Sequence, residues 1–153
     1  MRVILQVVSK SSVEVKGINK TYEINDGYNI LVGFTHDDTK KVVDAMVKKI
    51  VNLRVFIDEN EKMNLSIKDI DGSILSISQF TLYADTRKGN RPGFTNAMAP
   101  ESASLMYDYF NEQLRSYDIE VATGEFGADM LVRIDNVGPT TILLDSSEII
   151  KGL

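Results

Sequence analysis

The sequence predicts an α/β fold: a single domain with a mixed, largely antiparallel β-sheet or open barrel and two main helices. Two observations carry this prediction. Short β-branched runs bounded by turn residues recur towards both ends of the chain, and two segments, 42–51 and 105–117, repeat apolar residues at the helical period. The 153 residues contain no internal repeat, linker or low-complexity tract, so we expect one domain spanning residues 1–153.

The first 35 residues indicate a meander of three or four strands. Val3–Val8 is almost continuously apolar, which is typical of a strand buried on both faces. Residues 13–16 alternate apolar and charged side chains, which is typical of a strand with one wet face. After a turn signal at 25–27, the apolar run 30–34 predicts another buried strand.

The first helix is predicted around the apolar stripe 42–51. Asp37, Asp38 and Thr39 precede it and can cap its free amide groups. The sequence then predicts a strand at 54–57 and a polar loop at 58–64. A helical turn at 67–70 and a strand at 74–80 follow.

The second helix follows a long segment with no period. A structureless stretch such as residues 83–99 is uncommon in a compact domain and is usually functional or disordered. Pro100 opens the helix in its first turn, where the missing amide does no harm. Closing strands are predicted at 119–123, 130–135 and 140–144.

The composition excludes several kinds of chemistry. The chain has no Cys and one His, which excludes thiol nucleophiles, iron–sulfur ligation, cysteine zinc sites and any two-His metal site within one chain. We therefore expect no metal and no cofactor. The chain start lacks a signal-peptide pattern, and no apolar stretch reaches the roughly 18 residues of a membrane helix. These features favour a cytoplasmic protein without membrane contact.

The net charge of −5 is unevenly distributed. Residues 86–97 carry Arg87, Lys88 and Arg91 and no acid, so this segment holds +3 and the rest of the chain −8. A cationic loop of this kind can bind phosphate locally while the acidic remainder discourages general nucleic-acid binding. The alternative interpretation is a solvated loop that only aids solubility.

Two polar groups at the first predicted helix have alternative interpretations. His36, the only imidazole, can act as a general base or can simply lie on the surface. Asp37 and Asp38 can suggest a magnesium site, but two acids at a helix N-terminus are more simply explained by the helix dipole.

Two other segments combine polar or rigid groups with strand ends. Residues 78–82 place two hydroxyls and an amide where an apolar strand meets the long loop. These polar groups can bind a ligand, or they can form internal hydrogen bonds. Gly138-Pro139 lies between two strand-like runs and can form a hairpin turn. With a cis bond, it could instead hold its carbonyls as rigid acceptors.

In these and other segments the sequence resembles the D-aminoacyl-tRNA deacylase family over nearly its whole length. The similar segments follow one another in family order at Met1–Val3, Lys62–Ser66, Ser78–Tyr83, Arg87–Pro92, Gly124–Met130 and Asn136–Pro139. Each segment is weak alone, but together, in order and in a chain of family length, they are specific.

The resemblance implies a homodimer with active sites at the subunit interface. It implies hydrolysis of the ester that joins a D-amino acid to the 3′ adenosine of tRNA, with glycine as a further substrate. Ser78, Gln79, Phe80 and Thr81 would line the catalytic site. Gly138-Pro139, as a cis peptide from the neighbouring subunit, would exclude L side chains, with Met130 contributing to substrate binding. Arg87, Lys88 and Arg91 are assigned to tRNA phosphate.

Ester hydrolysis needs a positioned nucleophile and donors for the developing oxyanion, but not His, Cys or a metal. Backbone amides near Gln79 and Phe80 are candidate donors. Two routes remain open: Thr81 as nucleophile, without an obvious base, or water assisted by the 2′-hydroxyl of the terminal ribose. Val7 and Thr140 depart from the family pattern, in which Arg and Val are usual. Alternatives are a non-catalytic RNA-binding module and an interaction protein whose sheet mediates dimerisation.

Overall fold

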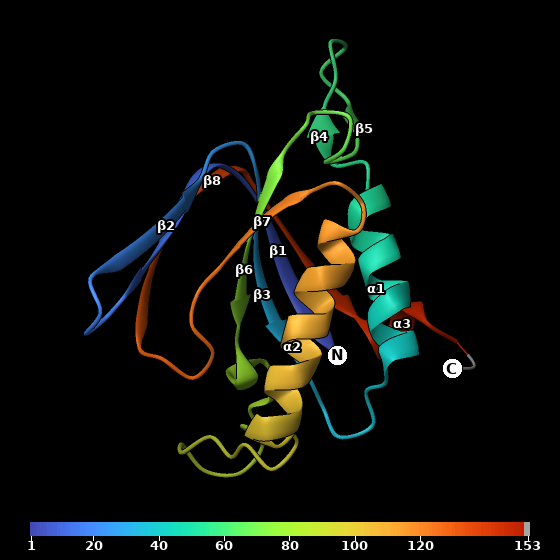
Figure 1. Cartoon of the computed structure of the whole chain (residues 1–153). Coiled ribbons are helices and arrows are strands. Elements are labelled where there is room, and N and C mark those ends of the chain that lie inside the picture. Colours follow the sequence, from blue (N-terminus) through green and yellow to red (C-terminus); the bar gives the residue numbers. More distant parts are fainter. Residues whose placement is uncertain (152–153) are drawn as a thin grey trace.

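The computed structural model describes residues 1–151, which form one curved, mixed sheet with helices against one side (Figure 1). Five strands follow the order β2-β1-β3-β6-β7, and β8 pairs with the remaining edge of β1. Their bounds are β1 (Arg2–Val15), β2 (Lys20–Ile24), β3 (Gly27–Gly33), β6 (Ser73–Ser78), β7 (Glu120–Thr123) and β8 (Met130–Asp145).

Parallel and antiparallel pairings are both present, as predicted. β1 runs antiparallel to β2, β3 and β8, whereas β3, β6 and β7 are parallel to one another. The sheet curls so that β2 also contacts β6 and β7, which nearly closes a barrel. The predicted α/β class and the open-barrel architecture are therefore confirmed.

Two long strands replace pairs of predicted short ones. β1 is continuous from Arg2 to Val15, and β8 is continuous from Met130 to Asp145. The prediction of separate strands at 130–135 and 140–144 was wrong about the connection. Gly138-Pro139 forms a bulge within one strand and not a hairpin, because both halves of β8 pair with the same partner β1.

The main core lies between the sheet and two packed helices, α1 (Lys40–Asn52) and α2 (Pro100–Arg115). Thr39 alone caps α1, since its side chain accepts from the amide of Val42. Asp38 instead accepts hydrogen bonds from the Met1 ammonium and the Thr35 amide, both at 2.7 Å. A short third helix, α3 (Ser146–Ile149), follows β8 and was not predicted. No helix in residues 1–151 is long and apolar enough to cross a membrane.

A small hairpin projects beyond the end of α1 (Figure 1). It contains β4 (Phe56–Ile57) and β5 (Met63–Leu65). The expected polar loop 58–64 therefore ends in a short strand, whose pairing with β4 the charged sequence did not reveal. The turn expected at 67–70 is present.

Burial along β1 alternates more than its sequence suggested. Val3 and Leu5 are fully buried, whereas Ile4 and Gln6 are only partly buried. The expectation of a strand buried on both faces was wrong for this segment, because the helices cover one face of the sheet and leave the other partly open.

Candidate active site

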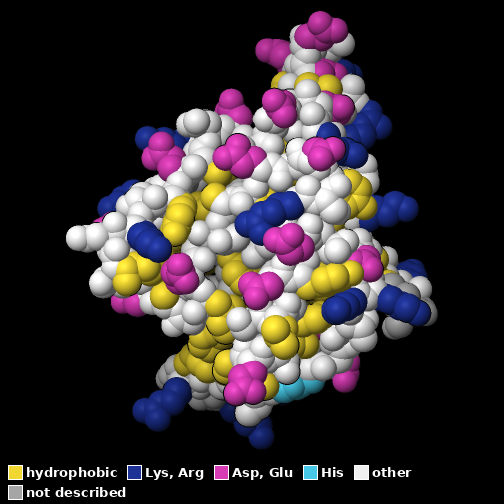
Figure 2. Space-filling view, in the orientation of Figure 1, with side chains coloured by type: hydrophobic (Ala, Val, Ile, Leu, Met, Phe, Trp, Pro, Cys, Tyr) yellow, Lys and Arg dark blue, Asp and Glu magenta, His cyan; other side chains and the backbone are white. Residues whose placement is uncertain are grey.

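A cavity of about 590 Å³ opens at the carboxyl ends of the parallel strands. β3 and β6 end at this edge of the sheet, and the cavity is completed by residues 94–100 and 126–130. The carboxyl edge of parallel strands is a common place for ligand sites, because the loops that follow the strands converge there. Figure 2 shows apolar side chains gathered around a hollow at the lower left, with basic side chains below them.

The close approach of β3 and the segment after β6 depends on Gly33. A Cβ atom at this position would lie 2.8 Å from the carbonyl oxygen of Gln79 and 3.2 Å from Cβ of Leu82. The amide of Gln79 in turn donates to the carbonyl of Val32 at 2.7 Å. This contact anchors the start of the 3₁₀ helix η1 (Phe80–Tyr83) at the cavity.

Three of the four predicted catalytic positions line this cavity: Ser78, Gln79 and Phe80. The hydrogen bond to Val32 occupies the amide of Gln79, so this amide is not free to bind an oxyanion. The amide of Phe80, in the first turn of η1, has no acceptor in the helix and remains the better candidate. Thr81 does not line the cavity, but its hydroxyl accepts a hydrogen bond from the Gln79 side chain.

Two aromatic rings form the outer wall. Phe80 and Phe94 meet edge to face, with ring centroids 4.9 Å apart. Phe80 is 56% exposed although its ring is large and apolar. Met130 lines the inner side, and its thioether lies against Gly124, where a Cβ atom would be 2.4 Å from Sδ. The cavity thus offers apolar walls beside a polar strand end.

The predicted basic loop is short and pinned at its base. Asp85 and Gly93 exchange two backbone hydrogen bonds, at 2.7 and 2.9 Å. Arg87, Lys88 and Arg91 are all exposed on the loop between them. Arg87 forms an ion pair with Asp85 at 2.8 Å. Hydrogen bonds from Arg87 lower the pKa of Asp85 to about 2. The ionised carboxylate of Asp85 lies beside Arg87 and offsets one of the three positive charges.

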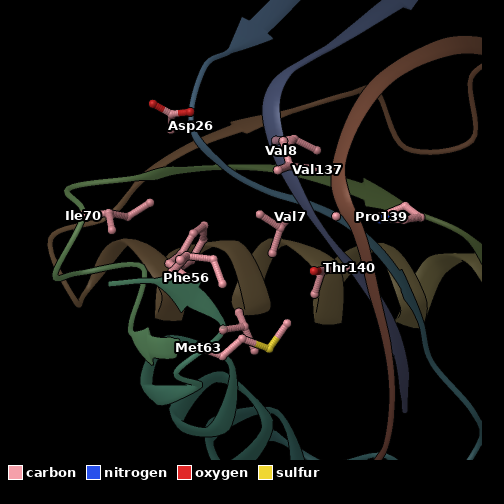
Figure 3. Close-up of a pocket in the computed structure, with 12 residues that line it drawn as sticks. Val7, Val8, Asp26, Phe56, Met63, Ile70, Val137, Pro139 and Thr140 are labelled. Carbon is pink, nitrogen blue, oxygen red and sulfur yellow. The ribbon is translucent and has the colours of Figure 1, made fainter. Parts of the chain in front are cut away.

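Gly138 and Pro139 lie at a different cavity, of about 650 Å³. Figure 3 shows Pro139 and Thr140 on β8 beside Val7 and Val8 of β1, with the hairpin residues Phe56 and Met63 nearby. The Gly138-Pro139 bond is cis. Within one chain, the structure therefore does not bring Gly138-Pro139 together with Ser78, Gln79 and Phe80, since the two cavities share no lining residue.

His36 does not line either cavity. It is exposed, and its Nε2 lies 2.6 Å from the carbonyl oxygen of Thr95. Its contact with the long segment agrees with a surface role and not with a general base. Among residues 1–151, no group of three or more His, Asp or Glu side chains is placed to hold a metal ion.

Arg2 supports the site and was not singled out by the sequence. Its guanidinium donates to the carbonyl of Leu82 in η1 at 2.9 Å and to Asp145 at 3.0 Å. It also lies 4.6 Å from the ring centroid of Tyr83. Arg2 therefore ties η1 to the end of β8. The only sequence signal was its place in the family-like start of the chain.

Comparison with known proteins decides the family. The family model described as D-Tyr-tRNA(Tyr) deacylase matches residues 4–145. The chain belongs to this family. The resemblance that the sequence motifs indicated is thereby confirmed, and the match includes most of β1, both main helices, the cavity and Gly138-Pro139.

Members of the deacylase family from bacteria are similar over almost the whole chain. A D-aminoacyl-tRNA deacylase from Staphylococcus haemolyticus is 53% identical over 97% of this chain and 97% of its own length. One from Clostridioides difficile is 52% identical over 97% of this chain and 99% of its own length.

Solved structures agree with the fold of this deacylase-family chain. One described as "c-Myc DNA Unwinding Element Binding Protein" has a TM-score of 0.87 and 41% identity, covering 95% of this chain and 98% of that one. A probable eukaryotic D-amino acid tRNA deacylase has a TM-score of 0.81 over 94% of this chain and 97% of its own. At 19% identity, the second likeness concerns the fold alone.

Proposed function

We propose that this protein hydrolyses the ester bond between a D-amino acid and the 3′ adenosine of tRNA, and that it rejects L-aminoacyl-tRNA. Its family membership supports the reaction class. The observation that carries the fuller proposal is the separation of the two halves of the site. The cavity with Ser78 and Phe80 has no wall from Gly138-Pro139 of the same chain, although both regions are exposed and apolar.

A homodimer resolves this separation. In it, Gly138-Pro139 of each subunit reaches the cavity of the other, so two complete sites form at one interface. The exposure of the bulge supports this arrangement: Val137 is 48% exposed, and Gly138 and Pro139 are also exposed. Exposed apolar side chains beside a functional loop are typical of surfaces that contact another protein.

The amide of Phe80 supplies the hydrogen-bond donor for the reaction. As the ester carbonyl is attacked, negative charge develops on its oxygen, and a fixed amide aimed at that oxygen lowers the barrier. The amide is held in place because Gln79, the preceding residue, is hydrogen-bonded to Val32. Mutation of such a donor in other enzymes costs about 10²–10³ in rate.

Water is activated by the substrate itself in this proposal. The Thr81 hydroxyl accepts from Gln79 and does not line the cavity, so it is poorly placed as a nucleophile. No imidazole lines the cavity to act as its base. The adjacent 2′-hydroxyl of the terminal ribose can instead orient the attacking water, since it lies next to the ester in every aminoacyl-tRNA.

Chirality is selected by exclusion. When the ester and the ammonium group are fixed, the two enantiomers exchange a hydrogen and a side chain at Cα. A rigid wall formed by the partner's Gly-Pro carbonyls on one side therefore excludes the L side chain and leaves the D side chain free. Glycine has hydrogen on both sides, so we expect glycyl-tRNA to be hydrolysed as well.

The deciding experiment is a deacylation assay with one tRNA charged with a D-amino acid, its L enantiomer or glycine. We expect rapid release of the D-amino acid and of glycine, and at least about 100-fold slower release of the L-amino acid, as a clash of a few kcal/mol requires. Binding of tRNA without release of any amino acid would contradict the proposal and favour the RNA-binding alternative.

The role of Gly138-Pro139 is tested separately with a Pro139→Ala variant. Loss of the fixed ring loosens the wall, so L-aminoacyl-tRNA should be hydrolysed faster than by the wild type. Unchanged discrimination in a folded dimeric variant would contradict selection by this loop while leaving the deacylase activity itself intact.

A further inference from the structure

The bulge that carries Gly138-Pro139 inserts several residues of β8 opposite a single residue of β1. β8 pairs with β1 up to Asn136, opposite Val8, and again from Thr141, opposite Gln6. Residues 137–140 therefore lie opposite the single residue Val7. A common bulge places two residues opposite one, so the ladder alone does not fix this loop.

One side chain closes the base of the loop. The Asn136 amide donates to the carbonyl of Val7 at 2.9 Å and to the carbonyl of Thr140 at 3.0 Å. Its oxygen accepts from Gln6 Nε2 at 3.2 Å and from the Thr141 hydroxyl at 3.1 Å. Both donor hydrogens of the amide are thus used, and its oxygen lies within reach of two donors. Asn136 connects the two ends of the loop with β1.

Thr141 extends this network to the loop itself. Its hydroxyl lies 3.2 Å from the carbonyl oxygen of Pro139 as well as 3.1 Å from the Asn136 oxygen. A hydroxyl has one proton, so Thr141 donates to one of these oxygens at a time. Gln6 Nε2 also donates to the Thr141 hydroxyl, at 3.4 Å. The Pro139 carbonyl is therefore within reach of the same network that closes the loop.

Packing offers little alternative support for the loop. Val137, Gly138 and Pro139 are exposed, and the Val7 side chain opposite them is apolar and forms no hydrogen bond. From β1, the polar contacts to the ends of the loop come from the Val7 carbonyl and the Gln6 side chain. The hydrogen bonds of Gln6, Asn136 and Thr141 are the polar contacts that join this loop to the sheet within residues 1–151.

We propose that Gln6, Asn136 and Thr141 are positioning residues that set how strictly L-aminoacyl esters are rejected. They act by holding the Pro139 carbonyl in one place, and none of them touches the substrate. The inference rests on the proposed function, since it concerns the wall that selects chirality. A loop held less firmly moves aside for an L side chain, whereas the D substrate does not press against it.

The test compares Thr141→Val with Thr141→Ser. Valine keeps the shape of threonine and removes the hydroxyl, and serine keeps the hydroxyl. We expect Thr141→Val to lower the D/L ratio of kcat/KM by about fivefold to tenfold, which corresponds to one neutral hydrogen bond. Thr141→Ser should stay within about twofold of the wild type on the same basis. Thr21→Val is the matched control, because Thr21 is an exposed strand threonine of β2.

Asn136→Ala removes the centre of the network and should lower the same ratio further. Thermal unfolding and the oligomeric state of each variant identify any that fail to fold. If Asn136→Ala does not fold, Thr141→Val still tests the inference. A folded Thr141→Val variant with the D/L ratio of the wild type would overturn the inference. If Pro139→Ala relaxed selection in that case, selection by the Gly138-Pro139 wall would still be supported. If it did not, selection by this wall would fail together with the inference, and the proposed deacylase activity would be judged separately by release of the D-amino acid.

Discussion

The thioether of Met130 lies against Gly124, so close that a methyl group at position 124 would come within 2.4 Å of Sδ. Both residues flank the connection from β7 to β8, and Met130 lines the candidate active site. The space left by a missing side chain at 124 therefore fixes where the Met130 side chain lies, and with it one wall of the cavity.

Gly124→Ala should displace Met130 towards the cavity. The nearest atoms belong to a flexible side chain, so the free energy of unfolding should change by less than about 1.5 kcal/mol. KM for D-aminoacyl-tRNA should rise severalfold, while kcat changes less. Steady-state kinetics measure this split. Gly93→Ala, where an added Cβ meets nothing within 4 Å, is the control, and equal KM values for both variants would contradict the prediction.

Thr81→Val distinguishes the two routes to hydrolysis. If the ribose 2′-hydroxyl assists water, the variant should lose less than about tenfold in kcat, the effect of one hydrogen bond to Gln79. A terminal 2′-deoxyadenosine should then abolish turnover by the wild type. Single-turnover deacylation of both substrates measures this. Complete inactivity of a folded Thr81→Val that still binds tRNA would favour Thr81 as nucleophile instead.

The basic loop should contribute unequally to tRNA binding. Lys88→Ala and Arg91→Ala should each reduce the slope of log K against log salt by about 1, as expected for loss of one phosphate contact. Arg87→Ala should have a smaller effect, because Asp85 already neutralises Arg87. Asp85→Asn should strengthen binding. Filter binding of uncharged tRNA at several salt concentrations tests the series, and equal slopes for all three alanine variants would count against it.

Tyr28→Phe should not destabilise the protein. The Tyr28 hydroxyl is fully buried and has no hydrogen-bond partner within residues 1–151, so its removal relieves a desolvation cost of about 1 kcal/mol. Burial also raises the pKa of Tyr28 above 10.0. The wild type therefore loses stability as the pH rises above 10, where the unfolded tyrosine ionises first. Urea unfolding at pH 7 and pH 11 should show an advantage for Tyr28→Phe that grows with pH.

Local sequence patterns predicted the elements whose stability is local. The stripe 42–51 and the Pro100 start gave both main helices, because apolar periodicity and first-turn chemistry depend only on neighbours in the chain. The pattern also indicated Ser78, Gln79 and Phe80 as a strand end next to a long segment, and these residues do line a cavity.

Pairing between residues that lie far apart in the sequence could not be predicted from local patterns. The continuity of β8 through Gly138-Pro139 depends on β1, about a hundred and thirty residues away, and a Gly-Pro pair alone favours a turn. The ion pair of Asp85 with Arg87 was missed because the charge of the loop was counted from residue 86. Occupation of the Gln79 amide required knowing that Val32 lies beside it.

The pairing of β1 with β8 affects how the protein folds during its synthesis. β1 is synthesised before the other strands of the sheet and β8 after them, yet the two pair along most of their length. While the segments between them are being synthesised, β1 has no β8 to cover its edge, so the sheet can be completed only after β8 has left the ribosome. Such non-local pairing slows folding. Before then, the unpaired edge is open to other nascent chains, and a homodimer would assemble from finished subunits.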